Sequence, residues 1–252
     1  MTRTDNPPAL QVWWASPDLA GPRHERLLNE VERGRLGRYR RPADRARFLT
    51  GVALSRLALG ELLGMPPERV PLVRECSDCA GPHGKPRLPG GEVELSVSHS
   101  GDRVAVAAGG RAPLGVDVEG VHDLGGDHEE LVRRVLGPEE RAELLQLPPE
   151  ERAHAFFTWW SRKEALLKAA GTGLHTPMTE LRVSPPLPGR APELLASGAA
   201  EVPVADASLS ALYPGAGYVA ALAVLGGGPV GAVEERDARE LLDLSPAGAR
   251  TA

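Results

Sequence analysis

The feature of this sequence that most constrains its fold is an order of elements that occurs twice. In each copy a helix is followed by a loop, a strand, a tight turn and a second strand rich in small apolar residues. The first copy covers 42–63, 93–97 and 103–108, and the second covers 150–170, 207–212 and 218–225. We therefore predict an α+β fold of two similar α/β halves related by a pseudo-twofold axis, with antiparallel sheets, a long helix in each half and an active site at the interface.

Two further elements set the expected boundaries of the halves. A helix is expected over 23–36, and a third strand over 114–119 opens the second half. We assign residues 1–113 to the N-terminal half and 114–230 to the C-terminal half. Residues 231–252 are expected to form a peripheral helix and a flexible tail.

Composition excludes several classes of partner. The 252 residues carry a formal net charge of −5, so the chain lacks the basic surface that nucleic-acid binders and polybasic membrane binders use. Its N-terminus has no apolar signal-peptide core, and no stretch approaches the roughly 20 apolar residues that span a membrane. We expect a cytoplasmic protein that binds neither nucleic acid nor membrane, and in which a local cluster holds any anionic ligand.

The only two cysteines, Cys76 and Cys79, form a CxxC pair that is followed by His83. Such a pair suggests zinc or thiol redox chemistry, but a structural zinc needs about four ligands and no second cysteine pair exists. The glycine and proline residues around it indicate a loop rather than a redox helix. We expect this pair to take no part in the chemistry of the protein.

Two carboxylates are placed on one strand so that they can share a cation. Asp117 and Glu119 are separated by one residue in the expected strand 114–119, and the two-residue period of a strand puts both on the same face. Acids held this close repel each other unless a cation lies between them. Oxygen ligands favour magnesium or manganese over zinc.

The second long helix carries a stripe of chemically distinctive residues. Trp160, Glu164 and Lys168 follow one another at intervals of four, so they lie along one side, with Lys163 beside them. The chain has only three lysines, Lys85 being the third, and otherwise uses arginine. Each lysine therefore suggests a need for a compact ammonium group that a planar guanidinium could not replace.

Together these segments are suited to phosphoryl transfer. They supply Asp117, Glu119 and Glu164 for one hard cation, and Lys163 and Lys168 for anionic oxygens. A cation that bridges phosphate oxygens and an ammonium that neutralises the departing phosphate are what this reaction requires. The chain has no GxxxxGK[ST] loop and no protein-kinase signature set, which argues against the commonest ATP-using folds.

The two motifs resemble a known family. The sequence GVD at 115–117, followed by WSRKEALLK at 160–168, is similar to the two-part signature of the 4′-phosphopantetheinyl transferase superfamily. Glu119, the chain length and the two similar halves resemble the larger, pseudo-dimeric class, which activates the carrier proteins of nonribosomal peptide and polyketide synthases in secondary metabolism. The resemblance covers most of residues 35–225 and implies a monomer with pseudo-dimeric architecture.

The resemblance implies a reaction and the residues that perform it. The family moves the 4′-phosphopantetheine group of coenzyme A to a serine of an acyl or peptidyl carrier protein and releases adenosine 3′,5′-bisphosphate. Asp117, Glu119 and Glu164 would hold magnesium, or manganese, against the pyrophosphate, and Lys168 would neutralise the leaving group. Glu164 and a magnesium-coordinated water both remain candidates for the base that deprotonates the serine.

Two short sequences resemble segments of the family that contact coenzyme A, namely GKP at 84–86 and SHS at 98–100. The implied contacts are to the 3′-phosphate and the pyrophosphate, and upstream basic residues would share in them. The lysines, serine and histidine concerned are Lys85, Ser98, His99, Lys163 and Lys168. The upstream candidates are Arg38, Arg40, Arg45 and Arg47.

Two alternatives remain open. A metal-dependent hydrolase of coenzyme A or another nucleotide pyrophosphate would use the same cation with water as the nucleophile. A non-catalytic regulatory protein could instead hold zinc with Cys76, Cys79 and His83. Carrier-dependent release of the bisphosphate would exclude the first alternative, and absence of zinc from the pure protein would exclude the second.

Overall fold

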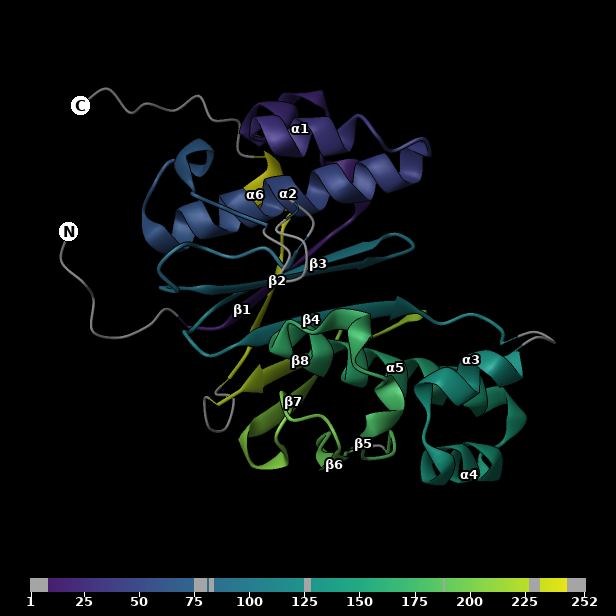
Figure 1. The fold of residues 1–252 in the computed structure, drawn as a ribbon. Helices are drawn as coiled ribbons and strands as arrows, with labels where there is room; N and C mark the ends of the chain where they lie inside the picture. The colour runs from purple at the N-terminus through teal and green to yellow at the C-terminus, as the bar shows by residue number, and fades with distance from the viewer. Residues whose placement is uncertain are drawn as a thin grey trace.

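Two stacked β-sheets, each covered on its outer face by one long helix, form the centre of the molecule (Figure 1). This computed structural model describes residues 9–74, 81, 84–124, 128–187, 189–226 and 232–243. None of the helices in these residues combines the length and the apolar character that a membrane span needs. Cys76, Cys79 and His83 lie outside the described residues.

The first sheet has four strands in the order β2-β3-β1-β9. Their bounds are Gln11–Ala15 for β1, Glu94–Ser100 for β2, Arg103–Gly109 for β3 and Glu234–Asp237 for β9. All neighbours are antiparallel except β1 and β9, which are parallel. The edge of this sheet is therefore built from a strand near the end of the chain.

The second sheet has three antiparallel strands in the order β4-β8-β7. Their bounds are Leu114–Gly120 for β4, Ala207–Leu212 for β7 and Tyr218–Leu225 for β8. A separate antiparallel pair consists of β5 (Leu181–Val183) and β6 (Leu194–Ser197). The helices are α1 (Glu30–Leu36), α2 (Pro42–Leu63), α3 (His128–Val135), α4 (Pro138–Gln146), α5 (Pro149–Ala170) and α6 (Arg239–Asp243).

The two long helices begin and end where their sequences favour it. Proline occupies the first position of both α2 and α5, where its missing N–H is not needed. Gly64 and Gly171 follow the last residues and adopt left-handed conformations, with φ of 61° and 77°. Glycine takes this conformation without steric penalty, so both helices end there.

Three layers of apolar side chains hold these elements together. One cluster lies between α2 and the first sheet, with Val52 and Leu95 among its members. A second lies between the two sheets and includes Val116 and Leu222. A third joins α5 to the second sheet and to the smaller helices. Each long helix is therefore fixed to its sheet by continuous apolar packing, the main source of stability in such a fold.

The structure confirms the mixed α+β class with antiparallel sheets and the expected spans of α2, β7 and β8. It corrects three expectations. Residues 22–27 form a 3₁₀ helix that is separate from α1, rather than one helix over 23–36. Ser98 and His99 belong to β2 and not to a turn, because the hairpin closes tightly with Gly101 at a φ of 50°.

The third correction concerns the end of the chain. Residues from Glu234 onward do not start a helix, because they form β9 alongside β1 before the short helix α6 begins. All four residues of β9 are charged, which hides such an edge strand, and only its distant partner reveals it. The assignment of residues to two halves and the pseudo-twofold relation remain predictions.

Candidate active site

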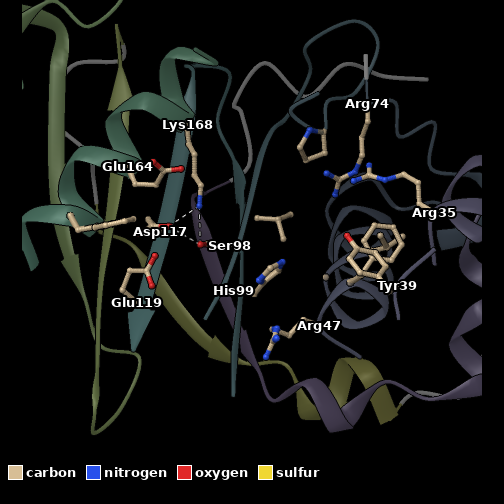
Figure 2. A pocket seen from close by; sticks show the side chains of 16 residues that line it. Arg35, Tyr39, Arg47, Arg74, Ser98, His99, Asp117, Glu119, Glu164 and Lys168 are labelled. Carbon is tan, nitrogen blue, oxygen red and sulfur yellow. Dashed lines mark hydrogen bonds and ion pairs between the residues drawn. The ribbon is translucent and has the colours of Figure 1, made fainter. Parts of the chain in front are cut away.

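An open pocket of about 300 Å³ lies between α2 and β2 on one side and β4 and α5 on the other (Figure 2). Its two walls differ in charge. The wall formed by β4 and α5 carries Asp117, Glu119, Trp160, Glu164 and Lys168. The wall that comes from α1, the loop after it, α2, β2 and the segment after α2 carries Arg35, Tyr39, Arg47, Arg74 and His99. The pocket can therefore hold a ligand that contacts both acidic and basic groups.

Gly115 explains how β4 and α5 come close enough to share a site. A Cβ atom at this position would lie 1.9 Å from the carbonyl oxygen of Ala165 and 2.5 Å from the amide nitrogen of Ala169. The strand therefore runs directly against the helix backbone, and only glycine allows this approach. Asp117, two residues further along, then lies beside the side chain of Lys168.

Lys168 and Asp117 form the centre of the acidic wall. The Nζ atom of Lys168 donates to Asp117 Oδ1 at 2.7 Å and to Ser98 Oγ at 2.8 Å. Burial raises the pKa of Asp117, whose side chain is 2% exposed, while Lys168 opposes that rise. Asp117 Oδ2 is buried without a hydrogen-bond partner.

The other two carboxylates line the same pocket. Burial, followed by the charge of Asp117, raises the pKa of Glu119 to about 7. Burial also raises the pKa of Glu164, and Glu164 Oε2 is buried without a hydrogen-bond partner. Carboxylates that repel one another and lack hydrogen-bond donors from the protein favour a cation as their partner.

No three side chains of the metal-binding types are gathered into a ready-made metal site among the described residues. The chemistry of the donors nevertheless fits a hard cation, because Asp117 and Glu164 each keep one buried oxygen free of protein donors. Asp117, Glu119 and Glu164 are therefore the residues that would hold such an ion.

The basic wall contains an arginine pair that the sequence did not single out. Burial, followed by the charge of Arg35, lowers the pKa of Arg74 to about 10. Arg74 Nε is buried and lacks a hydrogen-bond partner. Figure 2 shows both guanidinium groups side by side at the end of the pocket away from Asp117. Two guanidinium groups in this arrangement suit a doubly charged anion.

Several known proteins are similar to this chain in sequence. Residues 113–223 match the model of the 4′-phosphopantetheinyl transferase superfamily. The 4′-phosphopantetheinyl transferase HetI of Nostoc sp. is 32% identical over 206 residues, which cover 80% of each chain. The chain belongs to the 4′-phosphopantetheinyl transferase superfamily.

Two further relatives carry the name of a 4′-phosphopantetheinyl transferase. A putative 4′-phosphopantetheinyl transferase of Synechocystis sp., slr0495, is 34% identical over 175 residues, covering 66% of this chain and 67% of that protein. A 4′-phosphopantetheinyl transferase of Bacillus subtilis is 29% identical over 177 residues, covering 68% of this chain and 74% of that protein. The chain is therefore an enzyme of this transferase family, and its relatives support the larger class.

This pocket contains only part of the expected coenzyme-binding set. Ser98, His99, Arg47 and Lys168 line it. Desolvation, together with the charges of Lys168 and Arg47, lowers the pKa of His99. Arg47 also donates to the carbonyl oxygen of Gly101 at 3.0 Å, which ties α2 to the β2–β3 turn.

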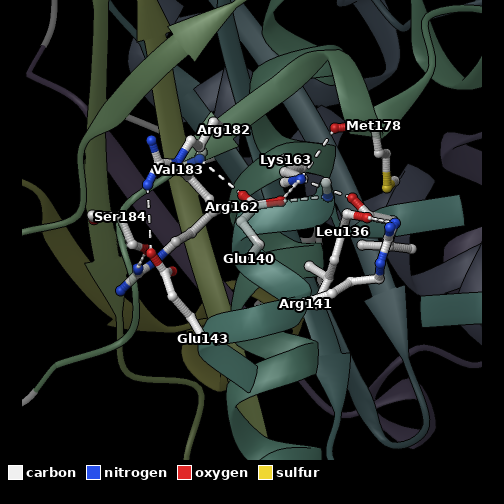
Figure 3. A network of polar contacts seen from close by, with 12 residues as sticks. Leu136, Glu140, Arg141, Glu143, Arg162, Lys163, Met178, Arg182, Val183 and Ser184 are labelled. Atoms are coloured by element: carbon white, nitrogen blue, oxygen red, sulfur yellow. Dashed lines mark hydrogen bonds and ion pairs between the residues drawn. The ribbon is translucent and has the colours of Figure 1, made fainter. Parts of the chain in front are cut away.

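Lys163 does not face this pocket, which corrects the expectation that it binds the cofactor. Its side chain is fully buried and pairs with Glu140 of α4, and it also donates to the carbonyl oxygens of Val135 and Met178 (Figure 3). It is next to Glu164 in the sequence, so the helix turns the two side chains in different directions. Its role is to anchor α5 to the smaller helices.

Four other expected residues lie elsewhere. Lys85 is 3.4 Å from both Glu94 Oε2 and the carbonyl oxygen of Ala169, near the end of α5. Arg45 binds Glu25 and the carbonyl oxygen of Leu36, so it joins α2 to the preceding segments. Arg40 and Arg38 are exposed outside the pocket lining. The arginines that do line this wall, besides Arg47, are Arg35 and Arg74.

Proposed function

We propose that this chain transfers the 4′-phosphopantetheine group of coenzyme A to a serine of an acyl or peptidyl carrier protein, in a magnesium-dependent reaction. The observation that carries this proposal is the pocket with one acidic and one basic wall. A cofactor with a pyrophosphate and a separate 3′-phosphate needs a cation site and a cationic side-chain site within one pocket. Because one chain supplies both walls, we expect the protein to act as a monomer.

The basic wall is suited to the 3′-phosphate. Arg35 and Arg74 can share its charge, and binding would relieve their mutual repulsion and give Arg74 Nε an acceptor. Arg47 and His99 lie between this pair and the carboxylates in the view of Figure 2, a position suited to the phosphates nearer the reacting centre. This replaces the upstream set of Arg38, Arg40 and Arg45.

The acidic wall is suited to a magnesium ion, which Asp117, Glu119 and Glu164 would hold. When bound, the ion would offset negative charge on the pyrophosphate oxygens. Lys168 adds a compact positive charge at the same place, 2.7 Å from Asp117. The chain would thus meet the charge of the pyrophosphate with both a cation site and an ammonium group.

The chemical step exchanges one phosphorus–oxygen bond for another. The carrier serine oxygen bonds to the β-phosphorus, which carries pantetheine, and the bond from that phosphorus to the bridging oxygen breaks. Adenosine 3′,5′-bisphosphate leaves with the bridging oxygen, and Lys168 neutralises the charge that develops there. The proton of the serine hydroxyl passes to a base, for which Glu164 and a water molecule remain the two candidates.

Chromatographic measurement of adenosine 3′,5′-bisphosphate tests this proposal against hydrolysis. The protein is incubated with coenzyme A and magnesium, with and without an apo carrier protein. We expect release only when the carrier is present, with one bisphosphate formed for each carrier modified. Equal release without the carrier would contradict the proposal and favour a pyrophosphate hydrolase.

A further inference from the structure

Strands β2 and β4 are edge strands of different sheets, and serine hydroxyls join them. Ser96, Ser98 and Ser100 accept hydrogen bonds from the amides of Val116, Val118 and Gly120 at 3.0, 3.4 and 3.1 Å. Because side chains on one face of a strand recur every two residues, the three hydroxyls form a ladder along the free edge of β4. The ladder supplies acceptors for amides that the β4–β8 pairing leaves unused.

Two members of this ladder also hold a carboxylate. Ser98 Oγ donates to Asp117 Oδ1 at 2.8 Å, and Ser100 Oγ donates to Glu119 Oε2 at 2.9 Å. Ser96 bonds only to the Val116 amide among the contacts of the described residues. All three serines therefore contact β4 in the same way, but only Ser98 and Ser100 also hold a carboxylate, and Ser96 does not.

The hydroxyl of Ser98 is fully used by the protein. Its one proton goes to Asp117, and its two lone pairs accept from Lys168 Nζ and the Val118 amide. A serine hydroxyl has one donor and two acceptor positions. This hydroxyl cannot also bind coenzyme A without releasing one of these partners, although the resemblance implied such a contact.

We propose that Ser98 and Ser100 are positioning residues that orient the Asp117 and Glu119 carboxylates toward a shared cation. This inference rests on the proposed magnesium site. Each serine fixes one carboxylate oxygen, leaves the other oxygen of that carboxylate for the ion and links the carboxylate to the opposite sheet. Partners that hold metal-binding carboxylates in place strongly affect metal affinity.

Ser100 gives the sharper test, because Ser98 also contacts Lys168. Mn²⁺ is titrated calorimetrically into the full-length protein in the presence of coenzyme A, and the melting temperature is measured without metal. We expect Ser100→Ala to weaken Mn²⁺ binding by roughly 10- to 100-fold. Ser100→Thr keeps the hydroxyl and should bind Mn²⁺ as the parent does. Should Ser100→Ala not fold, Ser100→Cys replaces it, because a thiol is a weak donor.

Ser96→Ala is the matched control. It removes an equivalent bond to β4, so it should lower the melting temperature, yet Mn²⁺ affinity should stay at the parent value. Equal loss of Mn²⁺ affinity in Ser96→Ala and Ser100→Ala would show that the ladder only joins the sheets. Unchanged Mn²⁺ affinity in Ser100→Ala would also overturn the proposal. If the parent itself binds no Mn²⁺ with coenzyme A, the metal assignment fails, and the positioning role fails with it.

Discussion

At the scale of single residues, the site depends on which charged group occupies each position. Lys168 places one small ammonium group between Asp117 and Ser98. Lys163, on the same helix, carries the same ammonium group, but it is buried and forms an ion pair with Glu140. The sequence spacing of Trp160, Glu164 and Lys168 predicted the correct stripe. Lys163 lies about 100° from Glu164 around the helix axis, and the same spacing argument could have excluded it.

Replacement of Lys168 by arginine tests the need for a compact ammonium group. Lys168 is 23% exposed and fits between two oxygens at 2.7 and 2.8 Å, where a broader planar guanidinium would displace Asp117. We expect Lys168→Arg to lower kcat by roughly 10- to 100-fold although the charge is kept. Steady-state kinetics against a carrier protein measures this, with Lys168→Met as the charge-free control. Normal turnover by the arginine variant would show that any positive charge suffices.

The carboxylate of Glu119 should make the metal-free protein less stable as the pH rises. Its pKa is raised from 4.5 to about 7, so between these values the folded state binds more protons than the unfolded state. The free energy of unfolding therefore falls across this window, and the penalty is complete above about pH 7. Thermal melts in a chelator should show Glu119→Gln gaining stability over the parent through this range. A constant difference across it would contradict the raised pKa.

At the scale of elements, the close contact of β4 with α5 is the feature that assembles the acidic wall. A methyl group at Gly115 would overlap the helix backbone at 1.9 Å, and backbone cannot move aside as a flexible side chain can. The site depends on this contact, because Asp117 comes from β4 while Glu164 and Lys168 come from α5.

Gly115→Ala should therefore destabilise the fold by about 3 kcal/mol or more, since overpacking typically costs 1–3 kcal/mol and backbone overlap is its severe case. Gly120→Ala on the same strand is the control, because its added Cβ would meet only ordinary contacts at 3.5 Å and beyond. Urea denaturation of both variants measures the difference in the free energy of unfolding. Equal stability of the two variants would mean that β4 and α5 can separate freely.

Local signals explain which elements the sequence could predict. Helix α2 has a proline at its first position and a glycine after its last, and the strands β7 and β8 are bounded by turn residues, so these elements were placed correctly. Strands β1 and β9 have only distant partners: β1 pairs with β3, 89 to 97 positions away, and with β9, 223 positions away. The Val-Trp-Trp run of β1 favours a strand but is too short to indicate its partners, and the charged sequence of β9 carries no such signal.

At the scale of the whole molecule, the two walls of the pocket come from segments that are far apart in the sequence. The carboxylates and Lys168 could be predicted because they lie in two compact motifs. Arg35 and Arg74 could not, because only folding brings the end of α1 beside the segment after α2. An arginine-rich chain offers many candidates, and the buried, unsatisfied Nε of Arg74 is visible only in the structure.

The arginine pair should determine recognition of the 3′-phosphate. We expect Arg35→Ala and Arg74→Ala each to weaken coenzyme A binding about tenfold or more, because a charge-assisted hydrogen bond contributes roughly 1.5–3 kcal/mol. Binding of 3′-dephospho-coenzyme A should change little. Arg45→Ala, which breaks contacts outside the pocket, is the control and should spare both ligands. Equal weakening of the two ligands by the pocket variants would place the 3′-phosphate elsewhere.

The central claim is that this pocket transfers phosphopantetheine to a carrier protein with the help of a cation held by the acidic wall. Intact-mass spectrometry of an apo carrier protein, incubated with this protein, coenzyme A and magnesium, tests it most directly. We predict a mass gain of about 340 Da on the carrier, absent when Asp117→Ala or Glu164→Ala replaces the parent or when a chelator is added. An unmodified carrier with the parent protein, or full modification by both variants, would contradict the claim.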